Sequence, residues 1–381
     1  MSRTVESGAG VGGAGASGAA GARPHLMAVD VGGTGTKAAL LDSTGRAREQ
    51  FWQPTGREAG PESVVRRVLD LVDGLCRRAS EAGSPVSAVG LAVPGIVDEA
   101  AGTALHSTAI GWHDVPFGRL VRERTGLPVA VSHDVRAGGV AEARLGAGRA
   151  ERDFLFVPVG TGIAAALIRD GRAVPGAHHR SGEIGHIAVR PDGERCACGG
   201  AGCAERYASA AAVSRRYGAA ARSHAPDAAG PALRTGGATF ATRVRGAVVD
   251  AAEVARRAAA GEPAARAVWD EAVSALADVL LVACAVLDPP LIVVGGGLAE
   301  SGDQLLVPLR ERMAERATVQ RVPALVRAEL GDRAGCLGAG LLAADLLAAD
   351  LPATCLPSVV PLSAEPLSVG HPSAAGEGES R

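Results

Sequence analysis

The sequence contains no asparagine, and Lys37 is the single lysine among 39 basic residues. A GC-rich genome, which replaces Lys by Arg and avoids Asn codons, is enough to explain both absences. The abundance of arginine is therefore no argument for binding nucleic acid, and the net charge of −2 gives no bulk attraction to nucleic acid or to an anionic membrane. Roles that Asn commonly fills must fall to other residues in this chain.

Aromatic residues are also scarce, at 3% of the chain, whereas hydrophobic residues as a whole reach 47%. A core with few rings must be built from Val, Leu, Ile and Ala, which favours an α/β architecture. With 381 residues the chain is long enough for two domains of ordinary size. No segment approaches the ~18 continuous apolar residues of a membrane span, and residues 1–23 lack the apolar stretch of a secretory signal. We expect a cytoplasmic protein that has no membrane partner.

Apolar periodicity divides the chain. Residues 1–24 and 351–381 have none and predict disordered tails. Apolar runs predict strands at 26–31, 38–41, 86–93, 129–132, 154–159, 163–168 and 291–294. Helices are predicted at 61–78, from 204 onward, at 251–260, 264–287 and 335–349, with an irregular loop at 218–246. We expect an N-terminal domain at 25–134, a C-terminal domain at 135–334, and a final helix at 335–350 that packs back on the N-terminal domain.

Glycine-rich turns directly follow three predicted strands. The first glycine turn contains Asp30, Gly32, Gly33 and Thr34, the second contains Gly160, Thr161 and Gly162, and the third contains Gly295, Gly296 and Gly297. Glycines let backbone N–H groups approach an anion closely, and a carboxylate such as Asp30 can hold Mg²⁺ through water. Each turn alone is explained equally well by an ordinary strand end, but together they predict a phosphate or nucleotide site. The arrangement of strand, glycine turn and strand occurs twice, which suggests two related halves facing one cleft.

Lys37 follows the first glycine turn. Its amine either points at a phosphate of that site or lies in water while its stem follows the strand. We assign it to the phosphate site.

One histidine and three cysteines within eighteen residues have the spacing of a closed zinc site, and they are His186, Cys196, Cys198 and Cys203. The other four of the seven cysteines are scattered, and an odd total argues against a disulfide framework. Because protein atoms fill all four positions, the zinc would be structural and would activate no water.

Two carboxylates, Glu183 and Glu205, bracket the zinc ligands, although a structural zinc site does not require them. A metal site that holds two acids in place suggests a scaffold for gripping a polar small molecule, and the alternative is a metal site without chemistry. A ligating His uses its second ring nitrogen for another partner, which substrate can supply here. Asp134 stands between a predicted strand and a helix, where it is either an N-cap or a general base. His133 alone is typical of a surface or packing histidine.

Taken together, these motifs resemble the ROK family of sugar kinases and repressors, within the actin-like (ribonuclease H-like) ATPase superfamily. The resemblance runs from about residue 26 to residue 349, and its most specific element is the Gly-Glu-x-Gly-His … Cys-x-Cys-Gly … Gly-Cys-x-Glu block. It implies a two-domain α/β actin-like fold with a cleft between the domains and a structural zinc site. It also implies that the first two glycine turns hold the phosphates of ATP, with Mg²⁺, while Gly295 and Gly296 border the adenosine.

The resemblance further implies a sugar site with Asp134 as the catalytic base, whose other residues are Gly95, His133, Glu183, His186 and Glu205. The chain departs from the family at one place, because the usual Asn-Asp-Ala-Asn is here His133-Asp134-Val135-Arg136. Asn presents both a donor and an acceptor, whereas neutral His offers one of each in a bulkier, tautomer-dependent geometry. The preferred hexose is therefore left open. The general loss of Asn from this chain explains the change to His133 as well as a change in sugar specificity does.

We expect an ATP- and Mg²⁺-dependent kinase for the 6-hydroxyl of an aldohexose, with glucose as the first choice and N-acetylglucosamine or N-acetylmannosamine as alternatives. The resemblance suggests a homodimer or homotetramer and leaves polyphosphate open as the donor. The alternatives from another functional class are a sugar-sensing repressor and a non-catalytic sugar-binding protein. Repressors of the family carry a helix-turn-helix domain before the first strand. Only about 25 residues precede that strand here, too few for such a domain, so we expect no nucleic-acid partner.

Overall fold

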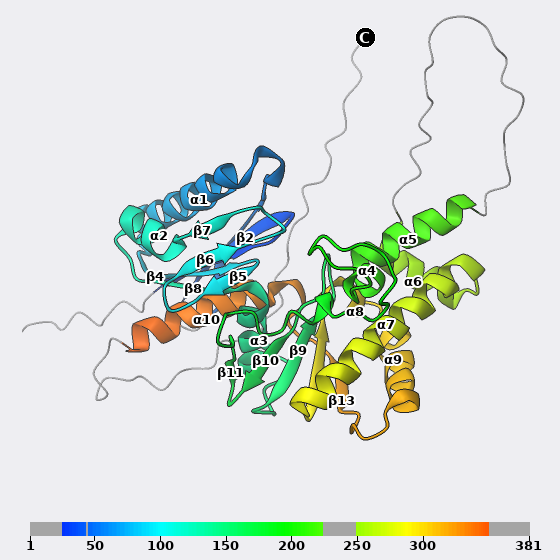
Figure 1. Cartoon of the computed structure of the whole chain (residues 1–381). Helices are drawn as coiled ribbons and strands as arrows, with labels where there is room; N and C mark the ends of the chain where they lie inside the picture. Colours follow the sequence, from blue (N-terminus) through cyan, green and yellow to red (C-terminus); the bar gives the residue numbers. More distant parts are fainter. Residues whose placement is uncertain (1–24, 43–44, 224–248, 350–381) are drawn as a thin grey trace, which may run out of the picture.

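Two five-stranded sheets, one from each half of the chain, organise the protein (Figure 1). The structure is a computed structural model that describes residues 25–42, 45–223 and 249–349. The two expected tails, 1–24 and 351–381, lie outside these residues. None of the described helices is long and apolar enough to cross a membrane.

The first sheet has the order β3-β2-β1-β4-β8, and its strands are β1 (His25–Val31), β2 (Gly35–Leu41), β3 (Ala47–Pro54), β4 (Val86–Val93) and β8 (Val129–His133). β2 runs antiparallel to both of its neighbours, β1 and β3, whereas β1, β4 and β8 run parallel. Asp30 therefore pairs with Ala92, and Val93 pairs with His133. Because parallel strands end at the same edge of a sheet, the first glycine turn and Asp134 come to one edge.

Alternate residues along these strands enter two different cores, as the period of two in a strand requires. Met27 and Val29 pack with α1 (Pro61–Glu81) and α2 (Phe117–Thr125), whereas Leu26 and Ala28 pack with α10 (Ala334–Ala349) on the opposite face. A short 3-10 helix, η1 (Arg57–Ala59), precedes α1. A small three-stranded sheet follows β4 and consists of β5 (Ile96–Asp98), β6 (Thr103–His106) and β7 (His113–Val115).

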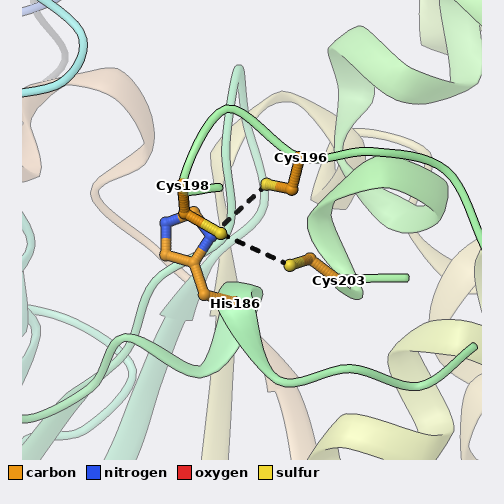
Figure 2. Close-up of side chains that lie close together, drawn as sticks. All are labelled: His186, Cys196, Cys198 and Cys203. Atoms are coloured by element: carbon orange, nitrogen blue, oxygen red, sulfur yellow. Dashed lines mark hydrogen bonds between the residues drawn. The ribbon is translucent and has the colours of Figure 1, made fainter. Parts of the chain in front are cut away.

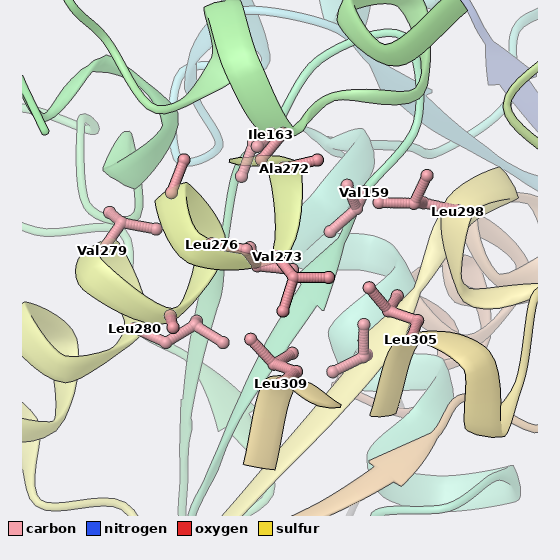
Figure 3. Close-up of a cluster of buried hydrophobic side chains, with 14 of the residues drawn as sticks. Val159, Ile163, Ala272, Val273, Leu276, Val279, Leu280, Leu298, Leu305 and Leu309 are labelled. Atoms are coloured by element: carbon pink, nitrogen blue, oxygen red, sulfur yellow. The ribbon is translucent and has the colours of Figure 1, made fainter. Parts of the chain in front are cut away.

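The second sheet repeats this plan with the order β11-β10-β9-β12-β13, formed by β9 (Phe154–Pro158), β10 (Ala166–Arg169), β11 (Arg172–Ala173), β12 (Leu291–Gly295) and β13 (Ala324–Arg327). As in the first sheet, a hairpin is followed by parallel strands. The helices of this half are α4 (Glu205–Ala208), α5 (Ala210–Ser223), α6 (Ala251–Ala259), α7 (Pro263–Leu287), α8 (Gly296–Ala299) and α9 (Asp303–Arg316). Figure 3 shows Leu276 and Leu280 of α7 packed with Leu305 and Leu309 of α9 in its main core.

Two helices lie between the sheets: α10 packs on β1, β4 and α3 (Asp134–Leu145), and α3 packs on β9 and β10 (Figure 1). Their contacts depend on glycine. A Cβ at Gly90 would lie 1.9 Å from the carbonyl oxygen of Ala339, and one at Gly338 would lie 2.0 Å from that of Ala137. This close backbone approach joins α10 to β4 and to α3, the helix that begins at Asp134.

The α/β class and the predicted strands and helices are confirmed, with shifted ends. The predicted hairpin partner of β9 is β10, which begins at Ala166 and not at 163 because an isolated bridge between Val159 and Ile163 precedes it. One prediction of local structure is wrong. Residues 218–223 belong to α5 and not to a loop, while 224–248 lie outside the described residues. The assignment of domains remains a prediction.

Candidate active site and metal centre

His186, Cys196, Cys198 and Cys203 converge on one point (Figure 2). His186 ends the 3-10 helix η2 (Ile184–His186), and Cys203 lies just before α4. The four ligand atoms lie within 4.8 Å of one another, with His186 Nδ1 3.7 Å from Cys196 Sγ and Cys198 Sγ 3.6 Å from Cys203 Sγ. Tetrahedral zinc with bonds of about 2.3 Å to sulfur places two sulfurs about 3.8 Å apart. The donor set and its spacing therefore fit zinc.

Backbone contacts shape the loop that carries these ligands. Ala188 bridges Cys203, and the N–H of Cys196 donates to the carbonyl of Gly200 at 2.9 Å. Gly202 has a φ of 70°, and a Cβ there would lie 1.5 Å from the carbonyl oxygen of Arg190, so only glycine fits. The loop is thus folded by its own turns around the place for the metal.

The second ring nitrogen of His186 faces a carboxylate. Its Nε2 lies 3.9 Å from Oε2 of Glu183, on the opposite side of the ring from Nδ1. This geometry agrees with a histidine that ligates metal through Nδ1 and presents Nε2 to another partner.

Glu205 lies against the second glycine turn. Its Oε2 accepts a hydrogen bond from the N–H of Ile163 at 3.0 Å, and a Cβ at Gly162 would lie 2.5 Å from the same oxygen. Glu205 therefore joins the predicted phosphate turn to the end of the zinc loop, residues 186–203 with the four candidate zinc ligands. The separate sequence motifs do not reveal this link.

Asp134 is the first residue of α3, and the N-cap of that helix is His133, so the N-cap alternative for Asp134 is wrong. Its Oδ1 accepts a hydrogen bond from the N–H of Val135 at 2.8 Å, and His133 Nε2 lies 3.1 Å from the same oxygen. Burial raises the pKa of Asp134 to about 6. The carboxyl group is thus a stronger base than an exposed aspartate.

Asp30, at the end of β1, shares this poorly solvated space. Burial raises the pKa of Asp30 to about 7, the charge of Asp134 adds to the rise, and the charge of Lys37 opposes it. A Cβ at Gly335 would lie 2.7 Å from Oδ2 of Asp30, so this carboxylate also meets the beginning of α10. The first glycine turn, Asp134 and the final helix therefore meet at one place.

The amine of Lys37 has a partner. Its Nζ lies 2.8 Å from Oδ2 of Asp332 and donates to the carbonyl of the same residue at 2.7 Å. Asp332 lies in the 3-10 helix η3 (Gly331–Arg333), which leads into α10. The alternative in which the amine lies only in water is wrong, while its role toward phosphate remains a prediction.

The glycine turns keep open space on one side. A Cβ at Gly33 or Gly160 would meet no atom within 4 Å, whereas Gly296 has a φ of 76° and a Cβ there would lie 2.6 Å from the backbone of Val159. The second and third turns therefore touch. Thr34 and Thr161 are exposed on the first two turns. Gly95, with a φ of 105°, packs against the carbonyl of His106.

Sequence reasoning missed one pair at this site, Arg136 and Glu99. Arg136 is 2% exposed, and its Nε donates to Oε1 of Glu99 at 2.8 Å. The only signal in the sequence is an arginine among small residues at the beginning of a predicted helix, which does not reveal its partner.

A cavity of about 440 Å³ lies elsewhere, between α5 and α7, and none of the predicted site residues line it. Its polar lining includes Glu194, Arg216 and Glu271, which are paired with one another. Because no chemistry-bearing motif reaches it, we do not assign the site there.

The sequence profile of the ROK family matches residues 26–346. The chain belongs to the ROK family. A glucokinase of Halalkalibacterium halodurans is 31% identical over 316 residues, which cover 82% of this chain and 92% of that glucokinase. An N-acetylmannosamine kinase of Citrobacter koseri is 30% identical over 318 residues, which cover 82% of this chain and 96% of that kinase.

Among solved ROK structures, a glucokinase from Streptomyces griseus in complex with glucose and AMPPNP matches with a TM-score of 0.68 and 30% identity. The match covers 84% of this chain and 99% of that one. The ROK resemblance inferred from the motifs is thereby confirmed, as is the actin-like α/β fold that it implied. The individual residue roles remain predictions.

Proposed function

We propose that this ROK protein is an ATP-dependent kinase that phosphorylates the 6-hydroxyl of an aldohexose, with glucose as the first substrate. The observation that carries the proposal is the pair of partly buried carboxylates, Asp134 at the beginning of α3 and Asp30 at the first glycine turn, which share one poorly solvated space. Similarity to glucokinases over most of the chain supports the choice of reaction.

In this proposal Asp134 takes or orients the proton of the 6-hydroxyl. Its pKa of about 6 makes it a better proton acceptor than an exposed aspartate while it stays largely ionised at pH 7. The backbone N–H groups of the first two glycine turns bind the phosphates of ATP and spread the charge of the transferring group. Mg²⁺, when bound with ATP, neutralises phosphate charge, and Asp30 is the residue that would hold it through water. Gly295 and Gly296 border the adenosine.

The rest of the hexose is held from the zinc loop. Glu183, His186 and Glu205 bind ring hydroxyls, and Gly95 gives the sugar a close backbone approach. A site built to hydrogen-bond hydroxyls strongly rejects a ligand that lacks them, since its own polar groups are then left unpaired. His186, Cys196, Cys198 and Cys203 would hold a structural zinc that fixes the positions of these side chains and takes no part in the chemistry.

Kinases for N-acetylmannosamine or N-acetylglucosamine are the second candidates. His133 stands where the family has Asn, and one relative at 30% identity is an N-acetylmannosamine kinase. A coupled assay of ADP formation over glucose, N-acetylglucosamine, N-acetylmannosamine, mannose and fructose tests the proposal, with polyphosphate as a second donor. We expect the highest kcat/KM for glucose with ATP. If none of these five sugars is phosphorylated, the kinase assignment is overturned.

A sugar-sensing or purely sugar-binding protein is the alternative from another class. Isothermal titration with glucose in the absence of ATP, compared with turnover, separates a binder from a kinase. Assembly as a homodimer or homotetramer and action in the cytoplasm, where ATP is available, are part of the proposal, and light scattering of the purified chain tests the assembly.

A further inference from the structure

The side chain of His133 is directed at the proposed catalytic base. Its Nε2 lies 3.1 Å from Oδ1 of Asp134, while its Nδ1 is buried and has no hydrogen-bond partner among the described residues. A carboxylate oxygen only accepts hydrogen bonds, so the nitrogen that faces it must carry the proton. A buried acceptor without a partner is also tolerated better than a buried N–H without one. Both observations favour the tautomer of His133 that is protonated at Nε2.

Arg136 and Glu99 hold the backbone of this segment. The guanidinium of Arg136 donates to Oε1 of Glu99 at 2.8 Å, to the carbonyl of Val97 at 3.0 Å and to that of His179 at 3.4 Å. Glu99 Oε1 also accepts from the Ser132 hydroxyl at 2.6 Å. The same oxygen accepts from the backbone N–H of His133 at 3.4 Å. One carboxylate oxygen thus ties the end of β8 to the first turn of α3.

Burial and a neighbouring cation keep the imidazole ring of His133 neutral. Burial lowers the pKa of His133 to about 4, the cation of Arg136 lowers it further, and Glu183 and Glu99 oppose both effects. Beyond Arg136 lies His179, whose Nε2 is 3.7 Å from Oδ2 of Asp98. On the other side, Asp134 faces Asp30, whose neighbours Lys37 and Asp332 carry opposite charges. His133 therefore stays a neutral donor at physiological pH.

We propose that Glu99, Arg136 and His133 form a positioning unit for Asp134, in which His133 Nε2–H and Val135 N–H bind Oδ1 and leave Oδ2 for the substrate hydroxyl. The family resemblance assigns His133 to the sugar, whereas the geometry assigns it to the base. This inference rests on the proposed function, since it needs Asp134 to be the residue that accepts the proton.

Three substitutions of His133 separate the two roles. The amide nitrogen of Gln reaches the place of Nε2, whereas that of Asn reaches only the place of Nδ1, and Ala has neither. We expect His133→Gln to keep kcat within about twofold, and His133→Asn and His133→Ala to lower it about fivefold with little change in the KM for sugar, as for the loss of one hydrogen bond. A donor to Oδ1 stabilises the charged carboxylate, so its loss also moves the acidic limb of the kcat profile up by about one pH unit.

His25→Gln, at the opposite end of the first sheet, is the matched control. It should leave kcat and the KM for sugar unchanged. A higher KM with unchanged kcat in His133→Asn would overturn the inference and place the residue on the sugar. Equal effects of Gln and Asn would overturn it as well. If the wild-type protein phosphorylates no hexose, the proposed function fails instead, and this inference about its base fails with it.

A second measurement needs no turnover. Long-range ¹H–¹⁵N spectra of the imidazole groups, assigned with His133→Gln, report the tautomer and charge of His133 in the intact chain. We expect a neutral ring protonated at Nε2 at pH 7, and a higher pKa in Arg136→Met, where the neighbouring cation is lost. A ring protonated at Nδ1, or a charged ring at pH 7, would overturn the inference whatever the activity.

Discussion

Asp30 and Asp134 share one poorly solvated space, where burial, together with the charge of Asp134, raises the pKa of Asp30 to about 7. One belongs to the first glycine turn and the other to the beginning of α3, and the parallel strands β1, β4 and β8 bring them to one sheet edge. Water alone screens two such charges poorly once they are buried, so a cation or a proton must relieve their repulsion.

Replacing the proposed base should separate binding from chemistry. We expect Asp134→Asn to lower kcat by about 10²–10⁴-fold, the usual contribution of a general base, while glucose binding stays within a few-fold. Single-turnover kinetics and isothermal titration measure the two effects. A variant with near wild-type turnover would remove Asp134 from the mechanism.

Activity should rise with pH as the base loses its proton. Since the pKa of Asp134 lies at about 6, kcat should fall as the pH is lowered through 6 and level off above it. A flat profile between pH 5 and pH 7.5 would contradict the assigned base.

Stability of the ligand-free protein should have the opposite pH dependence. Both pKa values are raised from 3.8, so the folded protein binds more protons than the unfolded one between about pH 4 and pH 7. The contribution of these groups to the free energy of unfolding therefore falls as the pH rises through that window. Because the Asp134 side chain keeps 30% exposure, we expect Asp134→Asn to stabilise the protein by only about 1 kcal/mol at pH 7. Thermal unfolding of both proteins at pH 5 and pH 7 checks the sign.

Removal of zinc should weaken sugar binding. The metal would fix His186 and the ends of the segment that carries Glu183 and Glu205, so a chelator should lower glucose affinity before it unfolds the protein. Cys203→Ser should act in the same way, whereas Cys284→Ser, at a buried cysteine outside the cluster, should not. Glucose titration with and without metal measures this, and a metal-free form with full sugar affinity would refute the bracing role.

The contact between α10 and its neighbours should be intolerant of a single methyl group. Gly338→Ala would place a carbon 2.0 Å from a backbone oxygen and should destabilise the protein by about 1–3 kcal/mol. Gly74→Ala, in the interior of α1, meets nothing within 4 Å and should stabilise it by about 0.5–1 kcal/mol. Urea unfolding compares the two, and equal effects would contradict the close packing of α10.

The strands were predictable where their signal is local. The runs that became β1, β4, β9 and β12 are continuous and apolar, and the period of α1 is helical. Other elements gave no such signal. β3 contains the exposed polar run Arg48-Glu49-Gln50, and α9 contains Pro308, which argues locally against a helix. Tertiary packing of Leu305 and Leu309 overrides that local preference.

For the site, spacing was enough to predict that His186, Cys196, Cys198 and Cys203 come together, because all four lie within one short segment. The contacts between distant residues were not predictable. Glu205 bound to the second glycine turn, Lys37 paired with Asp332, and Arg136 buried on Glu99 each join segments far apart in the chain. Such pairs depend on how the two sheets are placed around α3 and α10, which no local pattern records.

The most direct test of the account is formation of glucose 6-phosphate from glucose and ATP by the purified full chain, with Asp134→Asn measured beside it. The account predicts ATP- and Mg²⁺-dependent product from the wild-type protein and a loss of about 10²–10⁴-fold in the variant. Equal rates in the two proteins, or no phosphorylated hexose from the wild type, would contradict it.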